Sequence, residues 1–135
     1  MKKILLLAAL ALAFAAPVRA DDQDAPVTRL LDRVKVCYEQ ADPAGLDQIL
    51  ALSMPDRGQV LERFRGEISD HRDIRLVYAV QRKVSDAEGA VWDVRWEWRA
   101  QTRSGAPAGG SVQTSIRFSV IDGRWQVTGV TRSDG

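Results

Sequence analysis

The chain has few residues of the types that carry out catalysis or bind metals. It contains one histidine, His71, and one cysteine, Cys37. These two residues are separated by most of a helical region and give no recognisable metal-ligand spacing. Nucleophilic catalysis needs a base beside a Ser, Cys or Thr, and a single histidine provides no pattern that identifies one. The sequence therefore predicts no metal, no cofactor and no catalytic residue of these kinds.

Aromatic side chains offer another chemistry, the binding of a flat or apolar molecule. Trp92, Trp96 and Trp98 alternate with charged residues, and side chains of a strand point to alternate faces, so all three indoles lie on one face. Residues at matching positions of neighbouring strands complete a candidate pocket for a small apolar ligand: Tyr78, Trp92, Trp96, Trp98, Thr114, Ile116 and Phe118. Tyr78 and Thr114 would be its polar anchors. The alternative, which packing favours, is that these side chains simply fill the core.

The opposite face of the same strand is charged. Asp93, Arg95, Glu97 and Arg99 alternate in sign, and Arg117 has the same parity on a neighbouring strand. Such a surface could form a self-complementary homodimer contact, because a two-fold axis sets each patch against its own copy. The alternative is a solvated ladder of ion pairs, each worth roughly 0.2–1 kcal/mol. The sequence leaves both interpretations open.

The N-terminal residues have the features of a signal peptide. A basic start is followed by an apolar run over residues 4–16 and by small residues at Val18 and Ala20. The run is shorter than the roughly 20 residues that span a bilayer. We therefore expect residues 1–20 to be removed and the mature chain to have no membrane span. We also expect it to be a periplasmic or secreted bacterial protein.

The mature part, residues 21–135, is short enough to be one domain. Loss of Lys2, Lys3 and Arg19 changes the formal net charge from +1 to about −2. The basic residues that remain are scattered, and nucleic-acid binding requires clustered ones, so we expect no nucleic-acid partner. With one cysteine there is no internal disulfide, and Cys37 shares a helical stripe with apolar residues, which predicts a buried thiol.

Helices are predicted in the first half of the mature chain. Apolar residues at three- and four-residue spacing indicate a helix that ends near Gln40 and has Pro26 in its first turn. Asp42 and Pro43 then provide a cap and a first-turn proline for a short helix that reaches Leu52. A third helix extends to Ile68, and residues 69–73 are expected to be a connector.

Strands are predicted from Ile74 onward, where the apolar period changes to two. Turns are expected at residues 86–89 and 122–123, and residues 104–110 are expected to form a hairpin loop. Four antiparallel strands result. Three helices followed by four one-sided strands predict an α+β domain in which the helices cover the apolar face of the sheet.

This pattern resembles the nuclear transport factor 2-like superfamily. The resemblance covers nearly the whole mature chain and depends on two motifs. One is the helix junction Ala-Asp-Pro-Ala-Gly-Leu at residues 41–46, and the other is the closing hairpin Ile-Asp-Gly-Arg-Trp-Gln-Val-Thr-Gly-Val at residues 121–130. The resemblance implies a cone in which a curved antiparallel sheet wraps around N-terminal helices.

Enzymes of this superfamily include isomerases, dehydratases and cyclases, but many members only bind or dimerise. Val34 stands about where the isomerases carry a tyrosine, and it cannot donate their hydrogen bond. Asp56 corresponds loosely to their base, but it fits better as a first-turn residue of the third helix. His71 lies in a charged segment and is expected to be exposed. A structure that placed Asp56, Tyr38 or His71 inside a pocket would favour catalysis.

These observations favour an exported, non-catalytic binding or interaction module of the cell envelope, with a cone that could hold a small apolar ligand. One alternative is a small isomerase, dehydratase or cyclase of the ketosteroid isomerase-like type. Another is an accessory protein that binds a protein partner through its sheet face.

Overall fold

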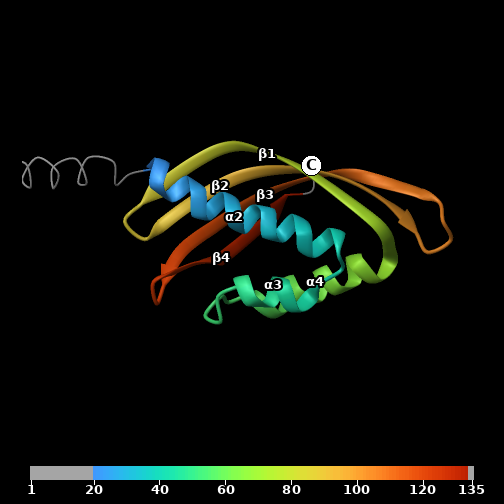
Figure 1. Ribbon diagram of the computed structural model, residues 1–135, viewed down its shortest axis with the longest axis horizontal. Coiled ribbons are helices and arrows are strands. Elements are labelled where there is room, and N and C mark those ends of the chain that lie inside the picture. The colour runs from blue at the N-terminus through green and yellow to red at the C-terminus, as the bar shows by residue number, and fades with distance from the viewer. Residues whose placement is uncertain (1–19, 134–135) are drawn as a thin grey trace, which may run out of the picture.

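The computed structural model describes residues 20–133. It contains three helices and a four-stranded antiparallel sheet, and the helices lie on one side of the curved sheet (Figure 1). The predicted α+β class is confirmed. Apart from Ala20, the predicted signal peptide lies outside the described residues.

The first described helix, α2, extends over Ala20–Glu39, and it is longer at its N-terminal side than the apolar spacing indicated. Pro26 therefore lies inside the helix and not in its first turn. Val27, Leu31 and Cys37 are fully or almost fully buried, as expected for one stripe of an amphipathic helix. The prediction of a buried Cys37 is confirmed.

The second helix, α3 (Pro43–Ile49), has the predicted N-terminal cap. The Asp42 carboxylate accepts a hydrogen bond of 3.0 Å from the backbone N–H of Gly45, and Pro43 occupies the first turn. The helix ends earlier than predicted, because the backbone becomes extended at Leu50. The next residue, Ala51, donates a backbone hydrogen bond to the carbonyl of Val127 in β4. Leu52, expected on the apolar face, is 88% exposed.

Helix α4 (Arg57–Asp70) leads directly into strand β1 (His71–Asp86), so the predicted connector at residues 69–73 is wrong. Within this segment the strand register shifts between Arg72 and Arg75, and Asp73 has a φ of 55°. Such a bulge bends the strand without ending it. His71 is thereby the first residue of β1.

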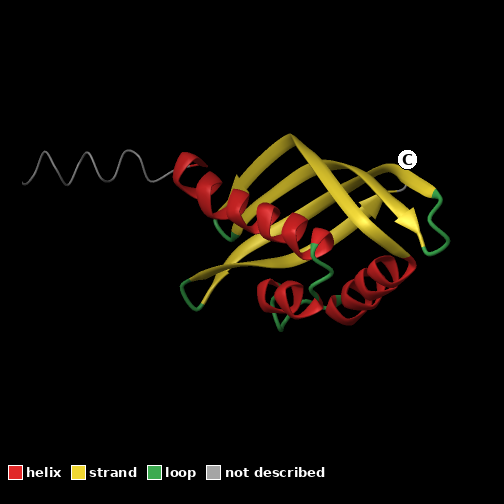
Figure 2. Ribbon diagram, turned by 45° about the vertical axis from the view of Figure 1, so that its right-hand side comes forward, coloured by secondary structure: helices red, strands yellow, loops and turns green. Residues whose placement is uncertain are grey.

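The sheet is a meander in which each strand pairs with the next, in the order β1, β2 (Gly89–Thr102), β3 (Pro107–Ile121) and β4 (Arg124–Ser133). All pairs are antiparallel, as predicted. The turn at Asp122 and Gly123 has φ values of 52° and 77°, the backbone form that a two-residue hairpin favours. Figure 2 shows the long, twisted strands on one side and the helices against their inner face.

The loop between β2 and β3 is shorter than predicted. Residues 104–110 were expected to form a loop, but β3 begins at Pro107, and Gly110 pairs with Trp98 of β2. A Cβ atom at Gly110 would lie 3.0 Å from Nε1 of Trp98, so glycine leaves the space that this indole occupies. Glycine in a strand often marks such a close approach.

The apolar face of β2 points into the core, as its alternation predicted. Trp92, Val94 and Trp96 are buried, and Trp98 is half-buried further along the strand. The charged residues between them are mostly exposed. The core thus lies between this sheet face and the three helices.

Candidate functional site

A cavity of about 170 Å³ lies between the helices and the inner face of the sheet. All three described helices and all four strands contribute to its wall. Most of the lining residues fall into two groups. The apolar interior consists mainly of buried side chains: Leu31, Leu46, Leu50, Ile74, Leu76, Trp96, Ile116, Phe118 and Val127. The second group is a set of polar side chains, described below.

Most of the sequence-predicted pocket residues line this cavity, namely Trp96, Trp98, Thr114, Ile116 and Phe118. They come together because alternate residues of β2 and β3 share one face of the sheet. Whether any of them binds a ligand stays a prediction.

Tyr78 and Trp92 do not line the cavity, and this corrects their predicted place in the pocket. The Tyr78 hydroxyl donates a hydrogen bond of 2.7 Å to Asp32 of α2 instead. Trp92 is packed in the core, with its ring 6.0 Å from that of Phe118 and with the Lys83 ammonium 4.7 Å above it. Both residues have the predicted strand parity, but neighbouring side chains occupy the space around them.

Thr114 lines the cavity with its hydroxyl already engaged. Its Oγ1 accepts a hydrogen bond of 2.9 Å from Trp96 Nε1 and donates one of 3.1 Å to the carbonyl of Val94. A hydroxyl has a single proton, so Thr114 can offer a ligand only a lone pair. These bonds hold the Trp96 indole in place against the cavity.

The polar side chains gather at one end of the cavity. We call Tyr38, Arg63, Glu67, His71 and Arg132 the polar cluster. Arg63 is exposed, and the other four are half-buried. Because Arg63 is exposed, the cavity wall reaches solvent at the polar cluster.

Glu67 is the centre of the polar cluster. Its Oε1 accepts a hydrogen bond of 2.8 Å from the Tyr38 hydroxyl, and its Oε2 lies 3.3 Å from Nη1 of Arg132. Burial, and then the neighbouring Glu67 carboxylate, raise the pKa of Tyr38 far above its usual value. Tyr38 is therefore a hydrogen-bond donor that stays protonated at neutral pH, and it joins α2 to α4.

His71 lies in the cavity wall, which corrects the expectation that it is an exposed linker residue. Its Nδ1 is 3.0 Å from the backbone carbonyl of Glu67, and its ring meets that of Trp98 edge to face with centroids 5.2 Å apart. A carbonyl can only accept, so Nδ1 carries the proton of this hydrogen bond. In the neutral ring, Nε2 is then left as an acceptor.

Sequence reasoning named Tyr38 and His71 but missed the other three members of the polar cluster, Arg63, Glu67 and Arg132. Arg63, Glu67 and His71 follow one another at four-residue spacing, so the helical period could have indicated a shared face. No local signal connected Arg132 to them, since it comes from β4 and reaches Glu67 only through the tertiary fold.

Asp56, the other residue considered as a base, does not line the cavity. It is the N-cap residue directly before α4, one position ahead of the first turn that the sequence predicted, and its side chain makes no capping hydrogen bond. Within residues 20–133, no group of three or more His, Cys, Asp or Glu could hold a metal ion. Across the same residues, no helix is both long and apolar enough to cross a membrane.

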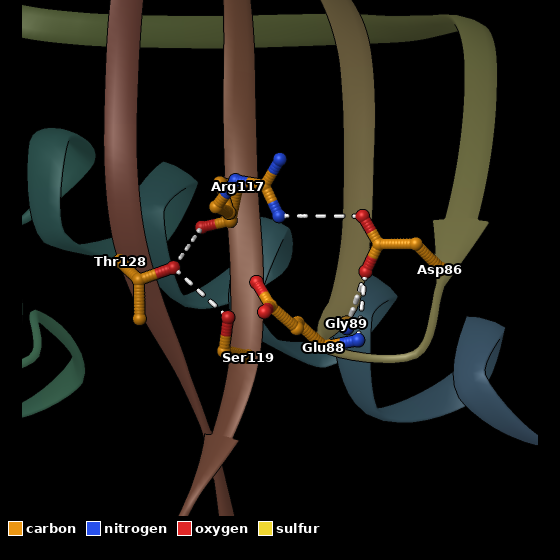
Figure 3. A network of polar contacts seen from close by, with 6 residues as sticks. All are labelled: Asp86, Glu88, Gly89, Arg117, Ser119 and Thr128. Carbon is orange, nitrogen blue, oxygen red and sulfur yellow. Dashed lines mark hydrogen bonds and ion pairs between the residues drawn. The ribbon is translucent and has the colours of Figure 1, made fainter.

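Side chains on the outer face of the sheet pair with one another. Asp86 accepts hydrogen bonds from the backbone N–H groups of Glu88 and Gly89 and lies 3.5 Å from Arg117, while Ser119 and Thr128 share another contact (Figure 3). The Glu88 N–H is the main cause that lowers the pKa of Asp86. This local pairing is compatible with a solvated face, and the homodimer stays a prediction.

Comparison with known proteins gives structural relatives only. No family model and no curated protein matches the chain. A nuclear transport factor 2-like superfamily protein from Salmonella enterica serovar Typhimurium is similar with a TM-score of 0.71 at 17% identity, covering 85% of this chain and 92% of that one. A candidate dehydratase of the same family from Streptomyces avermitilis is similar with a TM-score of 0.71 at 14% identity, covering 85% and 98%. An uncharacterised protein with a cystatin-like fold from Caulobacter vibrioides has a TM-score of 0.62 at 12% identity, covering 83% and 89%.

Proposed function

This chain has the nuclear transport factor 2-like fold, and on that premise we propose that it binds a small, largely apolar molecule in the cavity between its helices and its sheet. The observation that carries the proposal is that the cavity wall has an apolar part and a polar part. Buried apolar side chains form its interior, and the polar cluster stands at its opening. An apolar hollow with a few convergent polar groups is the usual form of a small-molecule site.

The size of the cavity limits the ligand. About 170 Å³ is close to the roughly 150 Å³ of an engineered apolar cavity that binds benzene. It is below the roughly 300 Å³ at which sites for drug-sized ligands begin. The ligand we propose therefore has a body of one ring or a short chain, and a four-ring steroid would need the cavity to widen.

We further propose that binding takes place outside the cytoplasm. The support is the pattern of residues 1–20, with its basic start, apolar run and small residues before Asp21. The protein would then act as a non-catalytic binding module of the cell envelope.

A neutral probe tests the binding proposal. The indole N–H signals of Trp96 and Trp98 should shift in NMR spectra when 3-phenylpropan-1-ol is added, because both rings line the cavity, while that of Trp92 should not. Val34→Phe should fill the cavity from α2 and weaken binding at least about tenfold. Val36→Phe is the matched control, since Val36 lies on the same helix, is 42% exposed and is not part of the wall. Equal binding by both variants would refute the site.

A second candidate function is catalysis of the dehydratase or isomerase type. Two observations favour it, namely that His71 and Tyr38 line the cavity, and that Nε2 of His71 is an acceptor in the neutral ring. Glu67 is a weaker candidate for a base, because both of its oxygens already have partners.

Native mass spectrometry of the mature protein separates the two functions. A non-covalent adduct would identify the ligand, and incubation of that ligand with the protein would follow. Conversion to a product of different structure that stops in His71→Gln would favour the enzyme. Recovery of the unchanged ligand would favour the binding module.

A further inference from the structure

The charges of the polar cluster do not balance. Two guanidinium groups, of Arg63 and Arg132, stand with one carboxylate, of Glu67. This leaves one net positive charge at the opening of the cavity when the His71 ring is neutral. A site with such an excess attracts a negative ligand group.

The two arginines have different surroundings. Arg132 is half-buried and forms an ion pair with Glu67, whereas Arg63 is exposed. Among the described residues, Arg63 makes no hydrogen bond or ion pair, and it acts on the polar cluster through its charge, which is felt at the Tyr38 hydroxyl. The Arg63 guanidinium is thus a cationic group of the cavity wall that has donors to offer and is not held by an ion pair with Glu67.

From this arrangement we propose that the ligand is a small apolar monoanion, in its simplest form a carboxylic acid, whose carboxylate binds Arg63 at the opening while its apolar body fills the interior. This inference rests on the proposed function and specifies the class of ligand. A guanidinium can hold a carboxylate through two parallel hydrogen bonds.

The rest of the wall defines the orientation of the ligand. A carboxylate in the interior would lose its hydration among side chains such as Leu50, Phe118 and Val127, which give it no donor. At the opening, Glu67 would repel it, but that carboxylate is engaged by Tyr38 and Arg132. Because Arg132 is paired with Glu67, we assign the carboxylate to the exposed Arg63 guanidinium.

A matched pair of probes tests the inference. 3-Phenylpropanoate and 3-phenylpropan-1-ol share the same ring and chain and differ in the charge of the end group. We expect the mature protein to bind the acid about tenfold more tightly than the alcohol at low salt. Added salt should reduce this preference, because Arg63 is exposed and screened.

Variants on α4 identify the residue. Arg63→Gln should weaken binding of the acid about fivefold and leave that of the alcohol within about twofold. Arg65→Gln is the matched control, since Arg65 is exposed on the same helix and does not line the cavity. Both arginines are exposed, so neither change should prevent folding.

The outcomes distinguish the inference from the proposed function. If the native protein binds the acid and the alcohol equally well, the inference is refuted, while the cavity remains a binding site. An equal loss of both probes in Arg63→Gln would also refute recognition of the charge. If neither probe shifts the Trp96 and Trp98 signals, the proposed function fails together with the inference.

Discussion

The hydroxyl of Tyr38 lies 2.8 Å from Oε1 of Glu67 and donates a hydrogen bond to it, which ties α2 to α4 beside the opening of the cavity. The Tyr38 ring also meets that of Phe64 edge to face, with centroids 4.7 Å apart. One side chain therefore packs against α4 with its ring and orients a carboxylate with its hydroxyl.

Removing this hydroxyl should destabilise the fold. Tyr38→Phe keeps the ring and leaves one oxygen of Glu67 without its donor, so we expect the free energy of unfolding to fall by about 1–2 kcal/mol. Tyr78→Phe is the control, because its bond to Asp32 lies in an exposed setting and should cost about 0.5 kcal/mol. Urea denaturation measures both, and equal losses would argue against a special role for the bond to Glu67.

The two tyrosines of the chain should also make stability depend on pH in alkali. Burial and the contact with Glu67 raise the pKa of Tyr38 far above 10.0, while burial and then the hydrogen bond to Asp32 raise the pKa of Tyr78 to about 12. An unfolded tyrosine loses its proton near a pH of about 10. Above that pH the unfolded state binds fewer protons than the folded state, so the free energy of unfolding should decrease as pH rises.

Absorbance at the tyrosinate band measures this ionisation directly. In the folded protein neither tyrosine should ionise at a pH of about 10, whereas in urea both should titrate there. A full tyrosinate signal in the folded protein at that pH would contradict the raised pKa values of both tyrosines.

The two aspartates that precede helices should respond differently to substitution. Asp42→Ala removes the hydrogen bond to the N–H of Gly45 and should lower the free energy of unfolding by about 1 kcal/mol. Asp56 makes no such bond, so Asp56→Ala should change stability by less than about 0.5 kcal/mol. Thermal denaturation of the two variants tests this, and the reverse order would contradict the assigned caps.

Cys37 should be unreactive in the folded protein. Its side chain is 1% exposed, and burial is the main cause that raises the pKa of its thiol, so little of the nucleophilic thiolate is present or accessible. A thiol reagent such as Ellman's reagent should label it only after denaturation in urea. Rapid labelling of the native protein would show that this part of α2 opens.

Local patterns in the sequence were enough to predict most of the elements. The alternation around Trp96, the Asp42 cap and the Asp122-Gly123 turn each reflect forces that act between residues close in the chain. Predictions failed where a distant contact decides the local form. Leu52 is exposed because the chain pairs with β4 at Leu50 and Ala51. Gly110 is paired with Trp98 across the sheet, and its lack of a side chain leaves space for that indole.

For the candidate site, too, some features follow from local sequence patterns and others depend on distant contacts. By itself the sequence determined the α+β order, the face of β2 that is dry and the burial of Cys37, because these follow from short-range periodicity. Only the tertiary structure decided that Tyr78 and Trp92 are outside the cavity and that Glu67 joins Tyr38 and Arg132 at its opening. Parity tells which face of the sheet a side chain is on. Which side chains from α2, α4 and β4 meet there depends on how the helices pack across the sheet, and no spacing along the chain encodes that packing locally.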